Sequence, residues 1–199
     1  MLLSNALTYL LETVFHLFVL AALLRFFMQA FHAPFRNPIA QFVAAITDFA
    51  VKPLRRIVPG LMGFDLASFL VAWIAEFILV LLLFWITGAA VLQSGSVFSV
   101  LLFIAFARLL RLSIYLLIGV VLVQAILSWV SPYHPIAPFF DTLTRPFLKP
   151  LRRFIPLVGG IDLTPLVILI LCQLILLVPI AWLEMESQRL LVRLAMPGN

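Results

Sequence analysis

The chain has 199 residues, of which 65% are hydrophobic and 11% are charged, and its formal net charge is +5 at pH 7. Because charged residues make up about a quarter of an average soluble protein, this composition excludes a water-soluble globule and indicates an integral membrane protein. About four spanning helices of roughly 20 residues, with their connections, account for this length, so we expect no separate soluble enzyme domain.

The first apolar run covers residues 6–31 and has few polar interruptions, among them His16 and Arg25. No lysine or arginine precedes this run. A secretory signal peptide would carry such a charge and would end in a small-residue cleavage site, which the sequence also lacks. We therefore expect a retained first transmembrane helix.

A short amphipathic segment and a basic motif follow the first run. Apolar residues recur at intervals of three and four between Ile39 and Phe49, the spacing of one face of a helix lying in the membrane surface. The Asn37-Pro38 pair is typical of a helix start. The basic segment 52–59, Lys-Pro-Leu-Arg-Arg-Ile-Val-Pro, comes next. Asp65 ends the turn after it, and we expect its carboxylate to cap the following helix.

The second apolar run covers residues 66–91 and predicts the second transmembrane helix. The fourth run covers residues 163–183 and predicts the last one, followed by a short tail of mixed charge. Each run is long enough to cross the hydrocarbon core of a bilayer, which needs about 20 residues of helix.

The third apolar run extends from Val97 to Val130. As one helix it would be about 51 Å long, well beyond a hydrocarbon core of roughly 30 Å. Arg108 and Arg111 divide it. We therefore expect residues 112–130 to span the membrane and residues 97–107 to lie along the interface.

The second half of the chain repeats the first. The basic segment recurs 97 positions later as Lys-Pro-Leu-Arg-Arg-Phe-Ile-Pro at residues 149–156, after an amphipathic segment that His134-Pro135 introduces and before Asp162, a second expected helix cap. Such recurrence indicates a tandem duplication. We predict an all-α integral membrane fold with four transmembrane helices as two tandem hairpin repeats, each with an amphipathic interfacial helix. Residues 1–96 form the first repeat and residues 97–199 the second.

The basic residues predict the orientation in the membrane. Eight of them lie in the two loops within the hairpins, against four on the opposite side. Because cytoplasmic loops carry the excess of lysine and arginine, we expect both basic loops in the cytoplasm and the termini outside. The expected location is the cell inner membrane.

The arrangement of these motifs resembles the YggT/YlmG family of bacterial and plastid membrane proteins. The shared pattern is an Asn-Pro or His-Pro pair, an amphipathic stretch, Lys-Pro-Leu-Arg-Arg, Gly-Gly and then Asp-Leu-Thr-Pro before an apolar helix. Residues 112–183 fit nearly throughout, whereas residues 10–90 depart from the pattern at Ala67 and Ser68. The resemblance implies a role in osmotic tolerance or in ion (potassium) homeostasis. The alternative that it implies is a membrane scaffold or assembly factor for cell division, nucleoid distribution or cytochrome maturation.

The repeated basic motif has two interpretations. It can be a lipid-facing surface that binds anionic phospholipids, since each basic residue near the membrane surface contributes about 1 kcal/mol toward acidic headgroups. It can instead be a topology determinant without a recognition role. The candidate lipid-facing residues are Lys52, Arg55, Arg56, Lys149, Arg152 and Arg153.

Polar side chains within the apolar runs form a second candidate site. Glu76 lies about midway along its run, where an ionised carboxylate costs roughly 2.5–3.5 kcal/mol, so it must be protonated, paired or hydrated. His16 and Arg25 are its candidate partners. In the second repeat, Gln173 aligns with Glu76 and Gln124 with Arg25. We consider a proton- or cation-coupled site or, alternatively, a buried interhelical hydrogen-bond network.

Other classes of function lack support in the sequence. Three scattered histidines and the single Cys172 predict no metal site, disulfide or haem attachment, and we expect no cofactor. No nucleophile elbow, P-loop or zinc-protease motif is present, so we predict a non-enzymatic protein. The positive charge has its explanation in membrane topology, and we expect no nucleic acid. Besides lipids, the expected partners are further copies of the chain or other membrane proteins, because four spans are few to enclose a conduit.

Overall fold

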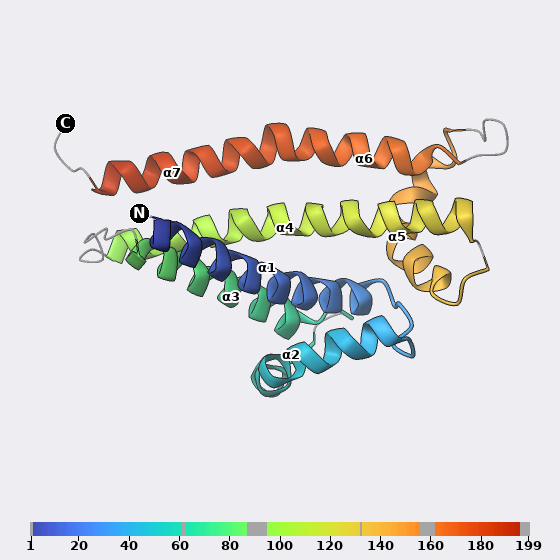
Figure 1. Cartoon of the computed structure of the whole chain (residues 1–199), viewed down its shortest axis with the longest axis horizontal. Coiled ribbons are helices and arrows are strands. Elements are labelled where there is room, and N and C mark those ends of the chain that lie inside the picture. Colours follow the sequence, from blue (N-terminus) through green and yellow to red (C-terminus); the bar gives the residue numbers. More distant parts are fainter. Residues whose placement is uncertain (1, 61–62, 87–94, 132, 156–161, 196–199) are drawn as a thin grey trace.

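The computed structural model describes residues 2–60, 63–86, 95–131, 133–155 and 162–195. The elements of this part of the chain are all helices (Figure 1). In chain order they are α1 (Leu2–Ala30), α2 (Pro38–Ile57), α3 (Leu66–Ile86), α4 (Gly95–Val130), α5 (Ala137–Leu151), α6 (Thr164–Ile175), the short π-helix η1 (Leu176–Ile180) and α7 (Ala181–Ala195).

Four helical segments are long and apolar enough to cross a membrane, which confirms the predicted fold class. They are Leu3–Ala30, Leu66–Ile86, Val97–Val130 and Thr164–Arg193. The start of α1 and the end of α7 lie at the same end of the molecule, and α2 and α5 follow α1 and α4 at their other ends (Figure 1). This arrangement is the one expected of two hairpins that enter the membrane from the same side. The predicted boundary between the repeats lies at the start of α4 and stays a prediction.

The connector helices α2 and α5 are amphipathic in both repeats. Asn37 caps α2, because its side-chain oxygen accepts a 2.8 Å hydrogen bond from the Ala40 backbone N–H, and Pro38 follows in the first turn. Thr47 and the equivalent Thr144 are both fully buried. Phe42 remains exposed on α2, so the helix presents one apolar surface to the protein and another outward.

The third apolar run is one unbroken helix, which corrects the prediction that residues 97–107 lie along the interface. Val97, Leu101 and Ala105 of α4 are buried in a cluster with Val80 of α3. At about 54 Å, α4 is longer than a hydrocarbon core. The predicted break at Arg108 and Arg111 does not occur, because acidic side chains of neighbouring helices lie beside both arginines.

The fourth run continues as a helix beyond its predicted end at Leu183, so the mixed-charge tail is helical as far as Ala195. The single turn η1 joins α6 to α7 and contains Pro179. Proline lacks a backbone N–H, and a wider π turn accommodates this interruption without ending the helix. The segment α7 then packs along α4. The two arms of the second hairpin, α4 on one side and α6, η1 and α7 on the other, are therefore helical over similar lengths.

Small side chains form the tightest part of the core, between the two helices of the first hairpin. Ala22 of α1 and Ala67, Ala72 and Ala75 of α3 belong to one buried cluster. Small residues allow helix backbones to approach closely, which supplies the packing that drives helix association in lipid. Helix α4 packs against α1 and α3 as well as against its own repeat, and it therefore joins the two hairpins.

Candidate functional site

Arg25 anchors a charged network where α1 meets the connector helix α2. Its Nη1 donates hydrogen bonds of 2.8 Å to Thr47 Oγ1 and to Asp48 Oδ1. Lys52 Nζ lies 2.7 Å from Asp48 Oδ2 on the outer side of the same carboxylate. Only 9% of the Arg25 side chain is exposed, so these partners compensate a nearly buried charge.

Asp65 connects this network to the start of α3. Its carboxylate accepts from the Ser68 backbone N–H at 3.3 Å and from Ser68 Oγ at 2.5 Å, and it forms an ion pair with Arg55. Arg25 Nε lies 4.0 Å away. The Asp65 side chain, which is 1% exposed, therefore caps α3 and interacts with two cations. The preceding turn contains Gly63, whose φ of 89° favours glycine.

The second repeat reproduces part of this geometry. Asp162 accepts a 2.9 Å hydrogen bond from the Thr164 backbone N–H, and Arg152 Nε donates to its other oxygen at 2.8 Å. The first arginine of each Arg-Arg pair therefore binds the loop aspartate of its own repeat. Arg55 and Arg152 thus each pair with a carboxylate ten residues later in the chain and still remain exposed, and their lipid-facing role stays a prediction.

Two half-buried acidic partners, Asp48 and Asp162, have lowered pKa values. Hydrogen bonds from Lys52 and then Arg25 hold the pKa of Asp48 below its ordinary value of 3.8. Burial of Asp162 opposes ionisation, but hydrogen bonds from Thr164 and Arg152 outweigh it and lower its pKa as well. Both carboxylates are therefore charged at neutral pH.

Glu76 lies at the centre of a second polar cluster. The side chain is fully buried, and neither carboxylate oxygen has a hydrogen-bond partner in the described part of the chain. His16 Nε2 is 3.7 Å and Arg108 Nη1 is 4.0 Å from Glu76 Oε1. The structure thus brings His16 to Glu76, as proposed from the sequence. Arg25 is engaged by Asp48 and Asp65 instead, and Arg108 takes the place that the sequence analysis gave to Arg25.

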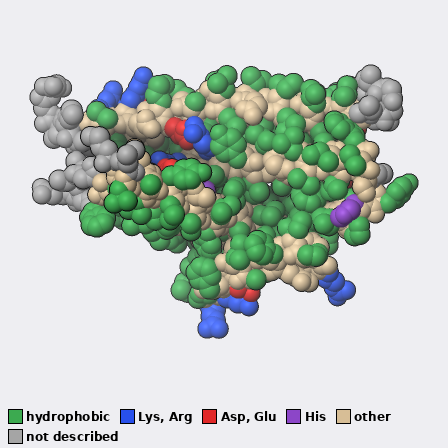
Figure 2. Space-filling model, viewed as in Figure 1, with side chains coloured by type: hydrophobic (Ala, Val, Ile, Leu, Met, Phe, Trp, Pro, Cys, Tyr) green, Lys and Arg blue, Asp and Glu red, His purple; other side chains and the backbone are tan. Residues whose placement is uncertain are grey.

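A cavity of about 390 Å³ adjoins this cluster, between α1, α4 and α7. Arg111 on its wall pairs with Glu184, and charged side chains are visible between α4 and α7 (Figure 2). The polar lining residues are Glu12, His16, Arg108, Arg111, Tyr115, Glu184, Ser187 and Gln188. Sequence reasoning treated Arg108 and Arg111 as boundary markers. Glu184, one of the two glutamates in the fourth run's tail, was the signal that could have suggested a partner for Arg111.

The repeat equivalents of the polar residues lie in different environments. Gln124 is buried with its side-chain oxygen unpaired in the described structure, whereas Gln173 is exposed on the surface of α6. Helix α4 packs on α3 and brings Arg108 to within 4.0 Å of Glu76, whereas the side of α6 that carries Gln173 is exposed. The equivalence of Glu76 and Gln173 therefore does not extend to burial.

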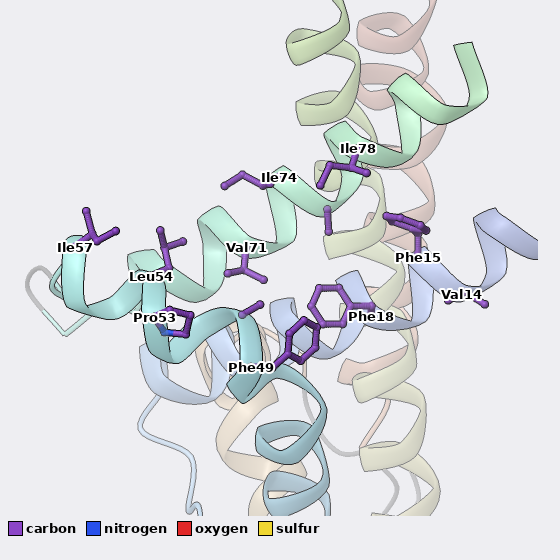
Figure 3. Close-up of a pocket in the computed structure, with 12 residues that line it drawn as sticks. Val14, Phe15, Phe18, Phe49, Pro53, Leu54, Ile57, Val71, Ile74 and Ile78 are labelled. Carbon is purple, nitrogen blue, oxygen red and sulfur yellow. The ribbon is translucent and has the colours of Figure 1, made fainter. Parts of the chain in front are cut away.

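A purely apolar groove of about 670 Å³ lies between α1, α2 and α3. Figure 3 shows Phe18 of α1, Phe49 and Pro53 of α2, and Val71 of α3 around it. No charged or hydroxyl side chain lines the groove. It can therefore accommodate hydrocarbon, such as a lipid acyl chain, but it offers no hydrogen bond that would select a particular molecule.

Comparison with known proteins assigns the chain to a family. The family model described as CCB3/YggT matches residues 4–86 and 103–183. The chain belongs to the CCB3/YggT family. The two matched segments correspond to α1–α3 and to the part of the second repeat that runs from α4 to α7. The resemblance identified from the motifs is thereby confirmed.

Several bacterial relatives cover most of this CCB3/YggT protein. An uncharacterized protein YggT of Escherichia coli is 40% identical over 173 residues, which are 86% of this chain and 87% of the relative. An uncharacterized protein of Vibrio alginolyticus is 38% identical over 83% of this chain and 89% of its own length. One from Pseudomonas aeruginosa is 34% identical over 87% of both chains. No solved structure matches.

Within this CCB3/YggT chain, the two polar clusters have different chemical capacities. The network of Arg25, Asp48 and Asp65 is saturated by its own ion pairs, so it can hold α1, α2 and α3 together but has little capacity for a ligand. The cluster around Glu76 contains a carboxylate without a hydrogen-bond partner among the described residues, beside a histidine and an arginine. Such a group can bind a proton, a water molecule or a cation. No group of three or more metal-ligating acidic, histidine or cysteine side chains occurs among the residues that the structure describes.

Proposed function

We propose that this CCB3/YggT protein is a non-enzymatic, multi-pass inner-membrane protein that contributes to osmotic tolerance or to ion (potassium) homeostasis. The observation that carries the proposal is the unsatisfied carboxylate of Glu76, fully buried beside His16 and Arg108. An ionisable residue within a membrane span, next to other polar groups, is typical of proton and ion pathways.

The proposed chemistry is a coupled exchange at Glu76. Leaving a bare carboxylate in an apolar interior is costly, so Glu76 is expected to hold a proton or a cation when its cavity is dry. When water enters and Glu76 releases that proton, Arg108 and His16 are close enough to stabilise the negative charge left on its carboxylate. Because the four spans pack around α4 rather than around an open channel, we propose that passage of an ion requires association with further copies or with another membrane protein.

The test uses purified protein reconstituted in liposomes. Potassium and proton fluxes are compared for the wild type, for Glu76→Gln and for Gln173→Glu. Glu76→Gln introduces the amide that the second repeat has at the equivalent position, and it removes the titratable group with little change in shape. We expect it to abolish the pH dependence of the flux. Gln173→Glu, on the exposed surface of α6, serves as the matched control and is expected to leave it in place.

Two outcomes contradict the ion-homeostasis proposal. One is a wild-type flux equal to that of protein-free liposomes, including when the protein has been cross-linked into oligomers. The other is a Glu76→Gln variant with wild-type flux at every pH. Circular dichroism of each reconstituted variant establishes that a lost flux does not reflect a lost fold.

A second candidate function is a membrane scaffold or assembly factor, favoured by the exposed cationic residues of the connector helices. Arg56 and Arg153, the second arginines of the two motifs, are exposed and form no ion pair within the described ranges. A scaffold predicts that Arg56→Gln combined with Arg153→Gln impairs growth under osmotic stress, whereas Glu76→Gln does not. The opposite pattern supports ion coupling.

A further inference from the structure

Three cations gather at the C-terminal end of the second connector helix. Arg145 and Lys149 of α5 and Arg153, just after its end, are all exposed. They line one cavity of about 490 Å³ together with Phe31, Thr142 and two prolines. No acidic residue belongs to this lining among the described residues. Arg145 and Lys149 are four apart and therefore lie on one face of the helix, and Arg153 lines the same cavity, so the three side chains can reach the same ligand.

The first repeat lacks the corresponding cluster. Its equivalent positions are Asp48, Lys52 and Arg56, so an acid stands where the second repeat has Arg145. Asp48 accepts from Arg25 and pairs with Lys52, so an acid lowers the positive charge of that surface and engages its lysine. In the second repeat Gln124 replaces Arg25, and no counterion for Lys149 occurs among the described residues. The duplication has therefore left one copy of the surface with an acid among its cations and one copy with cations alone.

Ion pairs within the protein also determine which basic residues remain available to bind a ligand. Arg152 is bound to Asp162 and does not line the cavity. Asp141 lies one turn before Arg145, but it forms no ion pair with it and is absent from the cavity lining. The three available cations are therefore not simply the predicted basic motif. They combine two of its members with Arg145, which lies a full turn outside it.

The floor of the cavity is aromatic and is fixed by contacts between the repeats. Phe31, just after α1, meets Phe147 of α5 edge to face with ring centroids 5.7 Å apart. Leu143 and Leu148 are buried beneath the helix. A cationic rim above an apolar floor fits a molecule with a phosphate at one end and hydrocarbon at the other, because arginine binds phosphate oxygens through paired N–H donors.

We propose that the cavity formed by Arg145, Lys149, Arg153 and Phe31 is a binding site for a phosphate group, supplied by the headgroup of an anionic phospholipid. The first repeat has no such site. This proposal does not rest on the function proposed above, because it concerns a different surface and requires no ion movement.

The experiment measures lipid binding to the full chain purified in neutral detergent. Native mass spectrometry counts bound phosphatidylglycerol, with phosphatidylcholine as the neutral control and inorganic phosphate as a competitor. Lys149→Gln is compared with Lys52→Gln, its exact counterpart in the first repeat. Losing one charge-assisted contact is expected to weaken phosphatidylglycerol binding about tenfold for Lys149→Gln. Lys52→Gln is expected to retain wild-type binding.

A second variant protects the test against misfolding. Arg145→Asp introduces the residue of the first repeat, and Arg145→Gln removes the charge alone. Both are expected to weaken binding while thermal unfolding stays close to that of the wild type. Equal binding of phosphatidylcholine and phosphatidylglycerol would overturn the proposal, as would equal losses for Lys149→Gln and Lys52→Gln. Tight binding of inorganic phosphate without lipid would retain the site but contradict the lipid as its source.

Discussion

Arg25 of α1 donates a 2.8 Å hydrogen bond to Asp48 of α2, and in the second repeat the equivalent positions are Gln124 and Arg145. The acid and its buried arginine are therefore both absent from the second copy. A buried guanidinium without a carboxylate is costly. The two differences between the repeats thus have one electrostatic explanation, and they lead to the following predictions.

Arg25→Gln should destabilise the first repeat. It leaves Asp48 and Asp65 without their shared partner, and the loss of a charged hydrogen bond should lower the free energy of unfolding by about 1–3 kcal/mol. Adding Asp48→Asn should cost much less than it does alone, because the two residues share one interaction. Chemical unfolding in detergent micelles measures all three variants. Strictly additive losses would show that the contact contributes no coupling energy.

Asp48 should also make stability depend on pH at the acidic end. Its pKa is lowered in the folded protein, so its contribution is complete above the unfolded value of about 3.9 and is lost as the pH falls through the folded value. The stability difference between wild type and Asp48→Asn should therefore be constant near neutral pH and should disappear as the pH falls through the lowered pKa of the folded protein. A difference that grows on acidification would contradict this sign.

Arg111→Gln should loosen α7. Glu184 would lose its ion pair within the bundle, and we expect the free energy of unfolding to fall by about 1–3 kcal/mol. Because the pair joins α7 to α4, amide hydrogen exchange should increase after Leu183 more than in α1 or α3. Arg189→Gln, which removes an exposed pair with Glu186 within α7, is the control. Uniform exchange across all helices would argue against a local role.

The orientation of the chain can be tested by cysteine labelling. Ile57 and Phe154 follow the two Arg-Arg pairs and are 78% and 85% exposed. Each is replaced by cysteine in a Cys172→Ser background. If the basic loops are cytoplasmic, a membrane-impermeant maleimide should label these positions only after the cells are permeabilised. Labelling in intact cells at both positions would invert the topology, and labelling at one would exclude parallel repeats.

The sequence predicted what recurs locally and missed what depends on contacts between helices. The basic segment repeated at residue 149, the proline pairs and the apolar periodicity are local patterns, and they located the two hairpins and the connector helices. Arg108 and Arg111 were interpreted as the boundary between an interfacial segment and the span that begins at residue 112, because a charge in an apolar run is costly unless it has a partner. Their partners lie on α3 and α7, and no spacing in the sequence reveals them.

The candidate site shows the same division. His16 and Arg25 were both proposed as partners of Glu76 because they are polar groups of the first span. The structure brings His16 to Glu76, whereas Asp48 and Asp65 pair with Arg25. Alignment of the repeats similarly assigned one environment to Glu76 and Gln173. Burial depends on the neighbouring helices, and the side of α6 that carries Gln173 is exposed whereas Glu76 is buried.

The contact between α3 and α4 joins the second transmembrane helix of the first hairpin to the first transmembrane helix of the second hairpin. A chain with a single hairpin has both surfaces as well, so two such chains could meet in the way that these two halves do. Fusion into one polypeptide would then have replaced a concentration-dependent encounter by a covalent one. Afterwards each half was free to change independently, and the charges on the two connectors record that divergence.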